Sequence, residues 1–436
     1  MNVRDQQILR IAVPSIVSNI TVPLLGLIDV AIVGHMGDAA YIGAVAVGAM
    51  VFNLVYWLFA FLRMGTSGMT SQALGRRDLG EDTKILVRSV VMALVIAAGL
   101  LVMQVPVRWG MFGLIGPTPD VLPFACAYYD IVVWGAPAML CLYSLTGWFI
   151  GMQNTRFPMI VSITQNVVNI AASLCLVYGL GMKIEGVAMG TVVAQYAGLA
   201  VAVVLLIRYY GRHLRRNGGD SRRPKGGGNW LAGFSANRDI FLRTLCLVAV
   251  NLYFTSAGAR SGAVILSVNT VIMQLYLLFS YFMDGFAYAG EALGGRLFGA
   301  RNAVAFRDTL RRLWLWALGV TTAYTLLYIV AGQWLIRLLT DERQVVEASA
   351  EYMVWAWVIP AAGAAAFIWD GIFIGLTATK GMLLSSVVST LAFFAVYGLL
   401  APCWGNHALW LAQVVCLAMR GVMQTFWYQA RINRTI

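Results

Sequence analysis

A single carboxylate, Asp29, interrupts the apolar stretch LLGLIDVAIVGH at residues 24–35, and no Lys or Arg lies within that stretch. Ionisable side chains inside a membrane are costly, and they commonly mark the path of an ion, a proton or a substrate. Because removal from water favours the neutral form of a carboxyl group, a proton can bind to Asp29 and leave it near neutral pH. We therefore expect Asp29 to act as a protonation switch. The alternative is an aspartic acid that stays neutral through a hydrogen bond to a neighbour.

Two prolines, Pro14 and Pro23, precede Asp29 in the same apolar run. Proline has no backbone N–H, so Pro23 leaves the carbonyl of Asn19 without its helical partner, and the helix can bend there. A titratable group that follows a point of bending is well placed to couple protonation to a change of helix shape.

Neutral polar side chains recur at helical spacing further along the same half. Asn169 and Ser173 are four residues apart, as are Thr191 and Gln195. Each pair therefore lies on one face of its helix. Such residues, taken alone, are ordinary hydrogen-bonding contacts between membrane helices, worth ~0.6–2 kcal/mol each.

Three carboxylates interrupt apolar runs in the second half. Asp284 and Glu291 are seven residues apart, so they lie on nearly the same helix face, and Asp370 interrupts FIWDGIFIG. Glu291 has Arg296 close by, so a structural ion pair is an alternative there. Asp284 and Asp370 have no basic neighbour in the sequence. We expect this carboxy-terminal group to bind a cation, take up a proton or face a cationic substrate.

The elements that must position these residues are membrane helices. The chain has 436 residues, of which 60% are hydrophobic and 11% charged, and its mean hydropathy is +0.75. About 20 apolar residues cross a bilayer core as a helix, in which every backbone polar group is paired internally. We expect an all-α polytopic membrane protein with twelve transmembrane helices, at residues 9–34, 40–75, 83–107, 121–152, 156–180, 185–209, 239–259, 262–299, 303–332, 346–376, 379–402 and 406–431.

A basic, glycine-rich stretch at residues 211–237 is the predicted linker between an amino-terminal lobe, 1–210, and a carboxy-terminal lobe, 238–436. Most of the 31 Lys and Arg residues fall on the side of the termini and this linker, including those counted from 208 to 243. The positive-inside rule then predicts cytoplasmic termini. We expect the protein to lie in a bacterial inner membrane. The net charge of +12 is explained by these loops. No aromatic residue interleaves with the basic ones in RHLRRNGGDSRRPKGGG at 212–228, so we expect no nucleic-acid partner.

The two predicted lobes repeat one another. GWFIGMQNTR at 147–156 returns as GIFIGLTATK at 371–380, and QALGRRD at 72–78 returns as RLFGARN at 296–302, both 224 residues later. Six helices separate equivalent points, so the repeats have parallel topology. Two such six-helix bundles would be pseudo-symmetric around a central cleft. Together with the carboxylates inside the membrane, this favours transport over a duplicated scaffold with no transport role.

Signatures of other functions are absent from the sequence. The six cysteines contain no C-x-x-C pair, and His35, His213 and His407 fall in predicted loops or at the very start of a predicted helix, so no metal site is expected. We find no G-x-x-x-x-G-K-[ST], H-E-x-x-H or G-x-S-x-G motif. The protein is therefore expected not to be an enzyme and to need no cofactor. Energy for transport would come from an ion gradient.

Several stretches resemble the multidrug and toxic compound extrusion (MATE) family, and in particular its DinF-like branch. They are PSIVSNITVPLLGLIDVAIVGH at 14–35, FLRMGTSGMTSQALG at 61–75, MDGFAYAGEALGG at 283–295, WDGIFIG at 369–375 and GNHALWLA at 405–412. The resemblance runs essentially from end to end. It implies a two-lobe, twelve-helix antiporter that exports organic compounds in exchange for protons or sodium ions.

The resemblance also implies roles for single residues. Asp29 matches the family's coupling aspartate and Pro14 its helix-bending proline. The family's amino-lobe polar network is similar to Tyr129, Asn169 and Thr191, to which we add Asn19, Ser173 and Gln195. Ser173 is a departure, because proton-coupled relatives often carry a second aspartate there. The predicted seventh helix also lacks the carboxylate of some sodium-coupled relatives, which favours protons as the coupling ion.

The expected function is thus efflux of amphipathic, often cationic, organic compounds by a monomer. Nineteen Met residues suit varied ligands, because Met side chains repack readily. One alternative is a flippase for lipid or polyprenyl-linked substrates, which would need a basic cavity for a phosphate. Another is a membrane sensor or enzyme that transports nothing.

Overall fold

The structure is a computed structural model that describes residues 2–34, 39–218 and 230–432, and these residues are helical almost throughout. Long apolar runs force this outcome, because a backbone inside a membrane must satisfy its own hydrogen bonds. The α-helices are α1 Val3–Gly34, α2 Ala39–Leu58, α3 Phe61–Arg76, α4 Leu79–Val102, α5 Gln104–Ile115, α6 Leu122–Val132, α7 Ala136–Gly151, α8 Arg156–Leu174, α9 Ile184–Gly218, α10 Trp230–Arg260, α11 Ala263–Gly299, α12 Ala303–Leu339, α13 Arg343–Gly375, α14 Thr379–Trp404 and α15 Asn406–Trp427.

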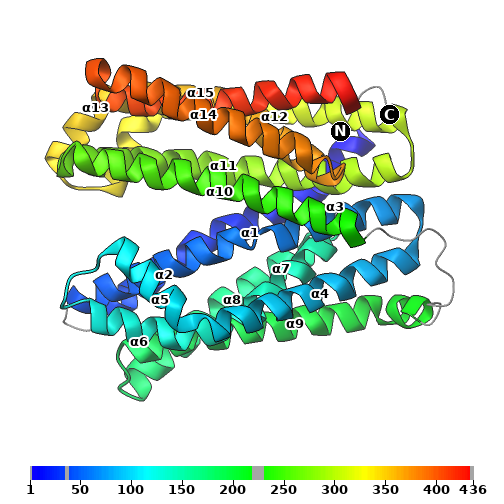
Figure 1. Ribbon diagram of the computed structural model, residues 1–436, viewed down its shortest axis with the longest axis horizontal. Helices are drawn as coiled ribbons and strands as arrows, with labels where there is room; N and C mark the ends of the chain where they lie inside the picture. Colours follow the sequence, from blue (N-terminus) through cyan, green and yellow to red (C-terminus); the bar gives the residue numbers. More distant parts are fainter. Residues whose placement is uncertain (1, 35–38, 219–229, 433–436) are drawn as a thin grey trace. The chain divides into compact units, whose positions relative to one another are not determined.

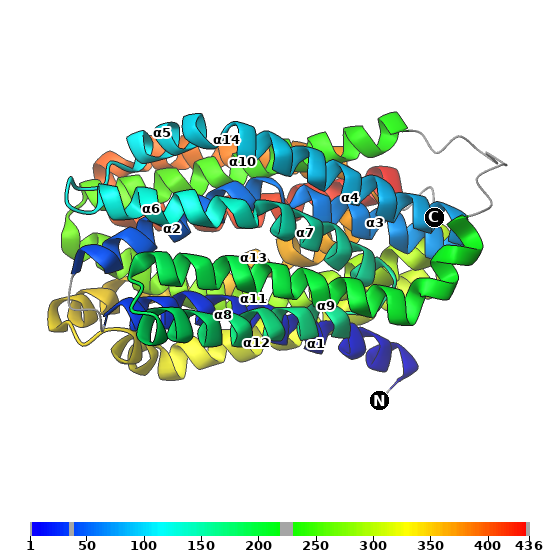
Figure 2. The same ribbon diagram turned by 90° about the horizontal axis from the view of Figure 1, so that it is seen from below.

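Eleven helical segments in the described part of the chain are long and apolar enough to cross a membrane. α1 adds another 32 residues, about 48 Å at 1.5 Å per residue. The predicted all-α membrane architecture is therefore confirmed. Neighbouring helices run side by side, as α14 and α15 do in Figure 1 and α8 and α9 in Figure 2.

Two predicted helices are interrupted. The expected helix at 40–75 is divided into α2 and α3 by a turn at residues 59–60. The one at 121–152 is divided into α6 and α7 by a 3-10 turn, Val133–Gly135, just before Pro137, which has no N–H to donate. A short helix that the sequence analysis did not expect, α5, follows α4.

The chain forms two compact units. One comprises Val17–Asn229 and is called the amino unit here; the other comprises Met1–Ile16 and Trp230–Ile436 and is called the carboxy unit. α9 runs to Gly218 and α10 begins at Trp230, so both helices extend into the stretch 211–237. Residues 219–229, like His35, lie outside the described residues.

α1 belongs to both units. In the carboxy unit, Asp5 accepts hydrogen bonds from Arg312 Nη1 at 2.9 Å and Trp316 Nε1 at 3.2 Å. In the amino unit, Asn166 Nδ2 donates to the carbonyl of Thr21 at 2.8 Å. The two ends of this helix are thus held by different bundles, and the division falls two residues after Pro14.

The sequence repeat is reproduced in the backbone. In the part of the chain that the structure describes, four non-glycine residues have positive φ and form two pairs, Arg77 (57°) with Arg301 (53°) and Gln153 (61°) with Thr377 (51°), each 224 residues apart. Directly after the first pair, Asp78 and Asn302 cap α4 and α12 by accepting from the N–H three residues later, at 3.0 Å in both cases.

Close helix packing also recurs at the same interval. A Cβ added to Gly147 would lie 2.3 Å from the carbonyl oxygen of Arg63, and one added to Gly371 would lie 2.1 Å from that of Ala287. Each unit therefore has a helix pair, α3 with α7 and α11 with α13, whose backbones approach too closely for any side chain at these positions.

Candidate functional site

Asp29 lies in the second half of α1, within the amino unit, and is 6% exposed. Its Oδ1 atom is buried and has no hydrogen-bond partner among the described residues. That oxygen therefore lacks the neighbour that would keep the carboxyl group neutral through a hydrogen bond. A buried acceptor left unpaired is costly, and it is available to a proton or to a donor on a ligand.

Asp29 lies within electrostatic range of Tyr128 on α6, which is part of a polar group that also includes residues of α8 and α9. Tyr128, 3% exposed, lies close to Asp29 and within reach of the Thr191 hydroxyl. Asn169 Nδ2 donates to Thr191 Oγ1 at 3.2 Å, while Asn169 Oδ1 is buried without a hydrogen-bond partner in the described chain. The structure thus brings Tyr128, Thr191 and Asn169 together as a polar group, with Asp29 beside the tyrosine.

Tyr129, the tyrosine named by the family resemblance, points elsewhere. Its hydroxyl donates to the carbonyl of Gln104 at 3.2 Å, and its ring stacks on Phe52 at a centroid distance of 5.2 Å. Adjacent residues on a helix face directions about 100° apart, so only one of the two tyrosines can face Asp29.

Replacing Tyr128 with Phe is expected to slow transport by up to about tenfold, because a hydroxyl beside Asp29 and Thr191 is lost and a neutral hydrogen bond is worth about 0.5–1.5 kcal/mol. The rate of substrate efflux from proteoliposomes measures this. Tyr129→Phe is the matched control and is expected to transport at the wild-type rate. The reverse order of effects would place Tyr129 in the network after all.

Ser173 and Gln195 sit where helices are close together. Ser173 Oγ would be 2.2 Å from a Cβ at Gly190, so α8 and α9 are in near backbone contact there. Gln195 packs against the interrupted helix at Gly135, where a Cβ would lie 1.6 Å from its Oε1. It also lies near the buried hydroxyl of Tyr56. These two residues line contacts between helices.

The helix-bending residues are placed along α1. Pro14 and Asn19 are half-buried on either side of the division between the units. The side chain of Pro23 lies outside the described residues.

Asp370 in the carboxy unit is paired with arginine, so the expectation that it lacks a basic partner is wrong. Arg243 Nη2 on α10 forms an ion pair with Asp370 Oδ2. Arg420 Nη2 on α15 is 3.7 Å from the same oxygen, and Gln424 Nε2 donates to Oδ1 at 2.6 Å. The partners come from helices distant in sequence, which inspection of the residues flanking Asp370 could not reveal.

The other two predicted carboxylates are on α11. Asp284 is partly exposed and lies within electrostatic range of both Arg243 and Arg420. Glu291 is fully buried, and its carbonyl oxygen would be 2.4 Å from a Cβ at Gly375. The structure therefore brings Asp284 and Asp370 into one charged group, whereas Glu291 lies at the tight contact between α11 and α13.

Two members of these groups, Arg243 and Gln424, are not among the predicted site residues, and the family resemblance pointed to Tyr129 with Tyr128 as its neighbour. Arg243 was counted with the basic linker, although it lies thirteen residues inside α10 and is 5% exposed. Its position between apolar residues, like that of Arg420 within α15, was the available signal.

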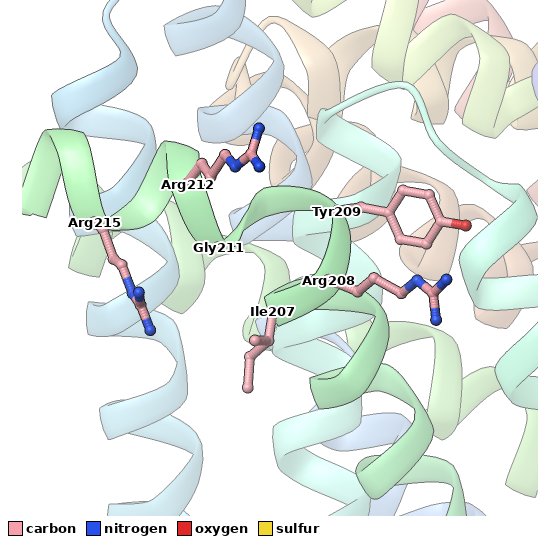
Figure 3. Close-up of a pocket in the computed structure, with 6 residues that line it drawn as sticks. All are labelled: Ile207, Arg208, Tyr209, Gly211, Arg212 and Arg215. Carbon is pink, nitrogen blue, oxygen red and sulfur yellow. The ribbon is translucent and has the colours of Figure 1, made fainter.

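A basic pocket of about 410 Å³ lies along α9. Figure 3 shows Arg208 and Tyr209 extending to the same side of the helix, with Arg212 and Arg215 one and two turns further on. Arginines at the end of a membrane helix commonly contact anionic lipid headgroups. The pocket contains none of the predicted site residues.

Comparisons with known proteins agree with this architecture. The MatE family model matches residues 14–175 and 240–398. The chain is 37% identical to DNA damage-inducible protein F of Escherichia coli (strain K12), covering 96% of this chain and 90% of that protein. It is 24% identical to Protein DETOXIFICATION 44, chloroplastic, of Arabidopsis thaliana, covering 95% of this chain and 80% of that protein.

The fold is also that of solved transporters. A structure described as the outward-facing conformation of a multidrug resistance MATE family transporter superposes with a TM-score of 0.87 at 18% identity, covering 99% of this chain and 96% of that chain. Because the family model matches most of the chain and the similarity runs over nearly its full length, the chain belongs to the MATE family, and it is a multi-pass membrane transporter for multidrug and toxin efflux rather than an enzyme.

Proposed function

We propose that this protein exports amphipathic organic compounds, cationic ones among them, in exchange for protons, and that Asp29 is the protonation switch. Both termini would face the cytoplasm of a bacterial cell, and the two helix bundles would work by alternating access. The observation that carries the proposal is a membrane carboxylate that is 6% exposed, with one oxygen lacking a hydrogen-bond partner among the described residues.

Three features of the amino unit support proton coupling. Among the described residues no basic side chain forms an ion pair with Asp29, so its charge is not held fixed by an arginine as that of Asp370 is. Tyr128 lies within electrostatic range of Asp29, and a tyrosine hydroxyl is able to donate to a carboxylate or accept from a carboxylic acid. Asp29 also sits on the one helix that both units share, so a change at Asp29 acts on an element held at both ends.

The choice between protons and sodium ions can be tested with purified protein in liposomes loaded with a fluorescent cationic dye. A pH gradient and a sodium gradient are imposed separately. We expect the pH gradient to drive dye movement and the sodium gradient to drive none above that of protein-free liposomes. Movement driven by sodium alone would contradict proton coupling.

A further inference from the structure

The carboxy unit holds two arginines that converge on one carboxylate. Arg243 and Arg420 are each 5% exposed, and an Nη2 atom of each faces Asp370 Oδ2. Arginine stays protonated in proteins, and each guanidinium carries five N–H donors. Asp370 alone therefore leaves this triad with one excess positive charge and many donors for few acceptors.

Some of these guanidinium N–H donors have no acceptor among the described residues. The Nε atoms of both Arg243 and Arg420 are buried and have no hydrogen-bond partner within the described part of the chain. Arg420 is also 3.7 Å from Asp370, which is a charge contact beyond hydrogen-bonding distance. Buried guanidinium groups with unpaired donors are costly inside a membrane protein, and an added anion would satisfy them.

The surroundings of the triad are apolar and aromatic on one side. The guanidinium of Arg420 lies 5.9 Å from the ring centroid of Phe367, and Tyr276 is close to Arg420. The remaining nearby charge is Asp284, which is partly exposed and within electrostatic range of both arginines. An entering anion would compete with Asp284 for the same positive charge.

From this arrangement we infer that Arg243 and Arg420 form a binding site for the acidic group of an amphipathic organic anion, with its apolar body against Phe367 and Tyr276. Carboxylates suit the site because guanidinium groups bind them through two parallel hydrogen bonds. This inference rests on the proposed function, since it names an additional substrate class for the exporter. It assigns to the carboxy unit the opposite polarity from the cation site expected there from sequence.

Three probes with one apolar body test the polarity of the site: pyrenebutyrate, pyrenebutanol and pyrenebutyltrimethylammonium. Their affinities are measured by pyrene fluorescence on purified protein in nanodiscs of zwitterionic lipid, with no ion gradient. We expect the wild type to bind pyrenebutyrate at least about tenfold more tightly than the trimethylammonium analogue. Equal or tighter binding of the cationic probe would overturn the inference. Because no ion gradient is present, this binding assay does not depend on proton coupling, so a failure of the proposed coupling stays distinguishable from a failure of this inference.

Variants separate a binding role from a structural one. Arg420→Gln is expected to weaken pyrenebutyrate binding by about tenfold or more, and Arg420→Lys by less, because lysine keeps the charge. Arg260→Gln, which changes an exposed arginine on the same helix as Arg243, is the matched control and is expected to change nothing.

Asp284→Asn is expected to change the affinity for pyrenebutyrate in the opposite direction. This variant therefore still tests the inference if the Arg420 variants do not fold. Removing a competing negative charge is expected to tighten pyrenebutyrate binding several-fold. In a cation site the same change would instead weaken binding of the trimethylammonium probe. Unchanged or weaker binding of pyrenebutyrate by Asp284→Asn would refute the anion site.

Discussion

Replacing Asp29 with Asn is expected to abolish proton-driven export while leaving the protein folded in the membrane. Asparagine has nearly the same size and still offers one acceptor, so the packing around this 6% exposed residue is retained. Asparagine cannot bind and release a proton, however, so the pH gradient can no longer drive transport. Efflux of a fluorescent cationic dye from proteoliposomes under a pH gradient is expected to fall to the level of protein-free liposomes.

Asp130→Asn is the matched control, because it removes a carboxylate from the same unit. Asp130 is exposed and pairs with Arg108, and exposed ion pairs contribute little. This variant should transport at the wild-type rate. If Asp29→Asn carried dye as fast as the wild type, Asp29 would have no part in coupling.

Gly371→Ala is expected to lower the stability of the carboxy unit sharply. The new Cβ would lie 2.1 Å from the carbonyl oxygen of Ala287 and 2.7 Å from its carbon, so α13 and α11 would have to move apart. Overpacking of this kind costs about 1–3 kcal/mol or more, since backbone atoms cannot rotate out of the way as a side chain can. Thermal unfolding of purified protein in detergent measures the change.

Gly398→Ala controls for the change of residue type. Gly398 is on α14, and a Cβ there would meet no atom within 4 Å. Alanine favours helix over glycine by about 1 kcal/mol, so this variant should melt at or slightly above the wild-type temperature. Gly147→Ala, the equivalent change in the amino unit, should destabilise like Gly371→Ala. A wild-type melting temperature for Gly371→Ala would mean that the two helices are not held this close.

Sequence alone determined the membrane architecture and the repeat. Helix length is set by bilayer thickness and helix interiors by the need to pair backbone groups, so apolar runs of sufficient length are close to unambiguous. The repeat at an interval of 224 residues could be recognised because both halves have similar turn residues and equivalent glycines. At Gly147 and Gly371 the neighbouring helix backbone is too close for any residue with a side chain. Asp29 was identifiable because a lone carboxylate in an apolar run has no local explanation.

Tertiary structure decided which side chains meet. Tyr128 and Tyr129 are adjacent, and only the rotation of α6 within its bundle determines that Tyr128 faces Asp29. Asp370 and Arg243 are 127 residues apart in the chain, so their pairing depends on how α10 and α13 pack. The same holds for α1, whose assignment to two units follows from contacts with α12 and α8. Hydropathy shows whether a single helix lies in the membrane. The rotation of that helix and the helices it contacts are set by packing between helices, and a local sequence pattern does not encode that packing.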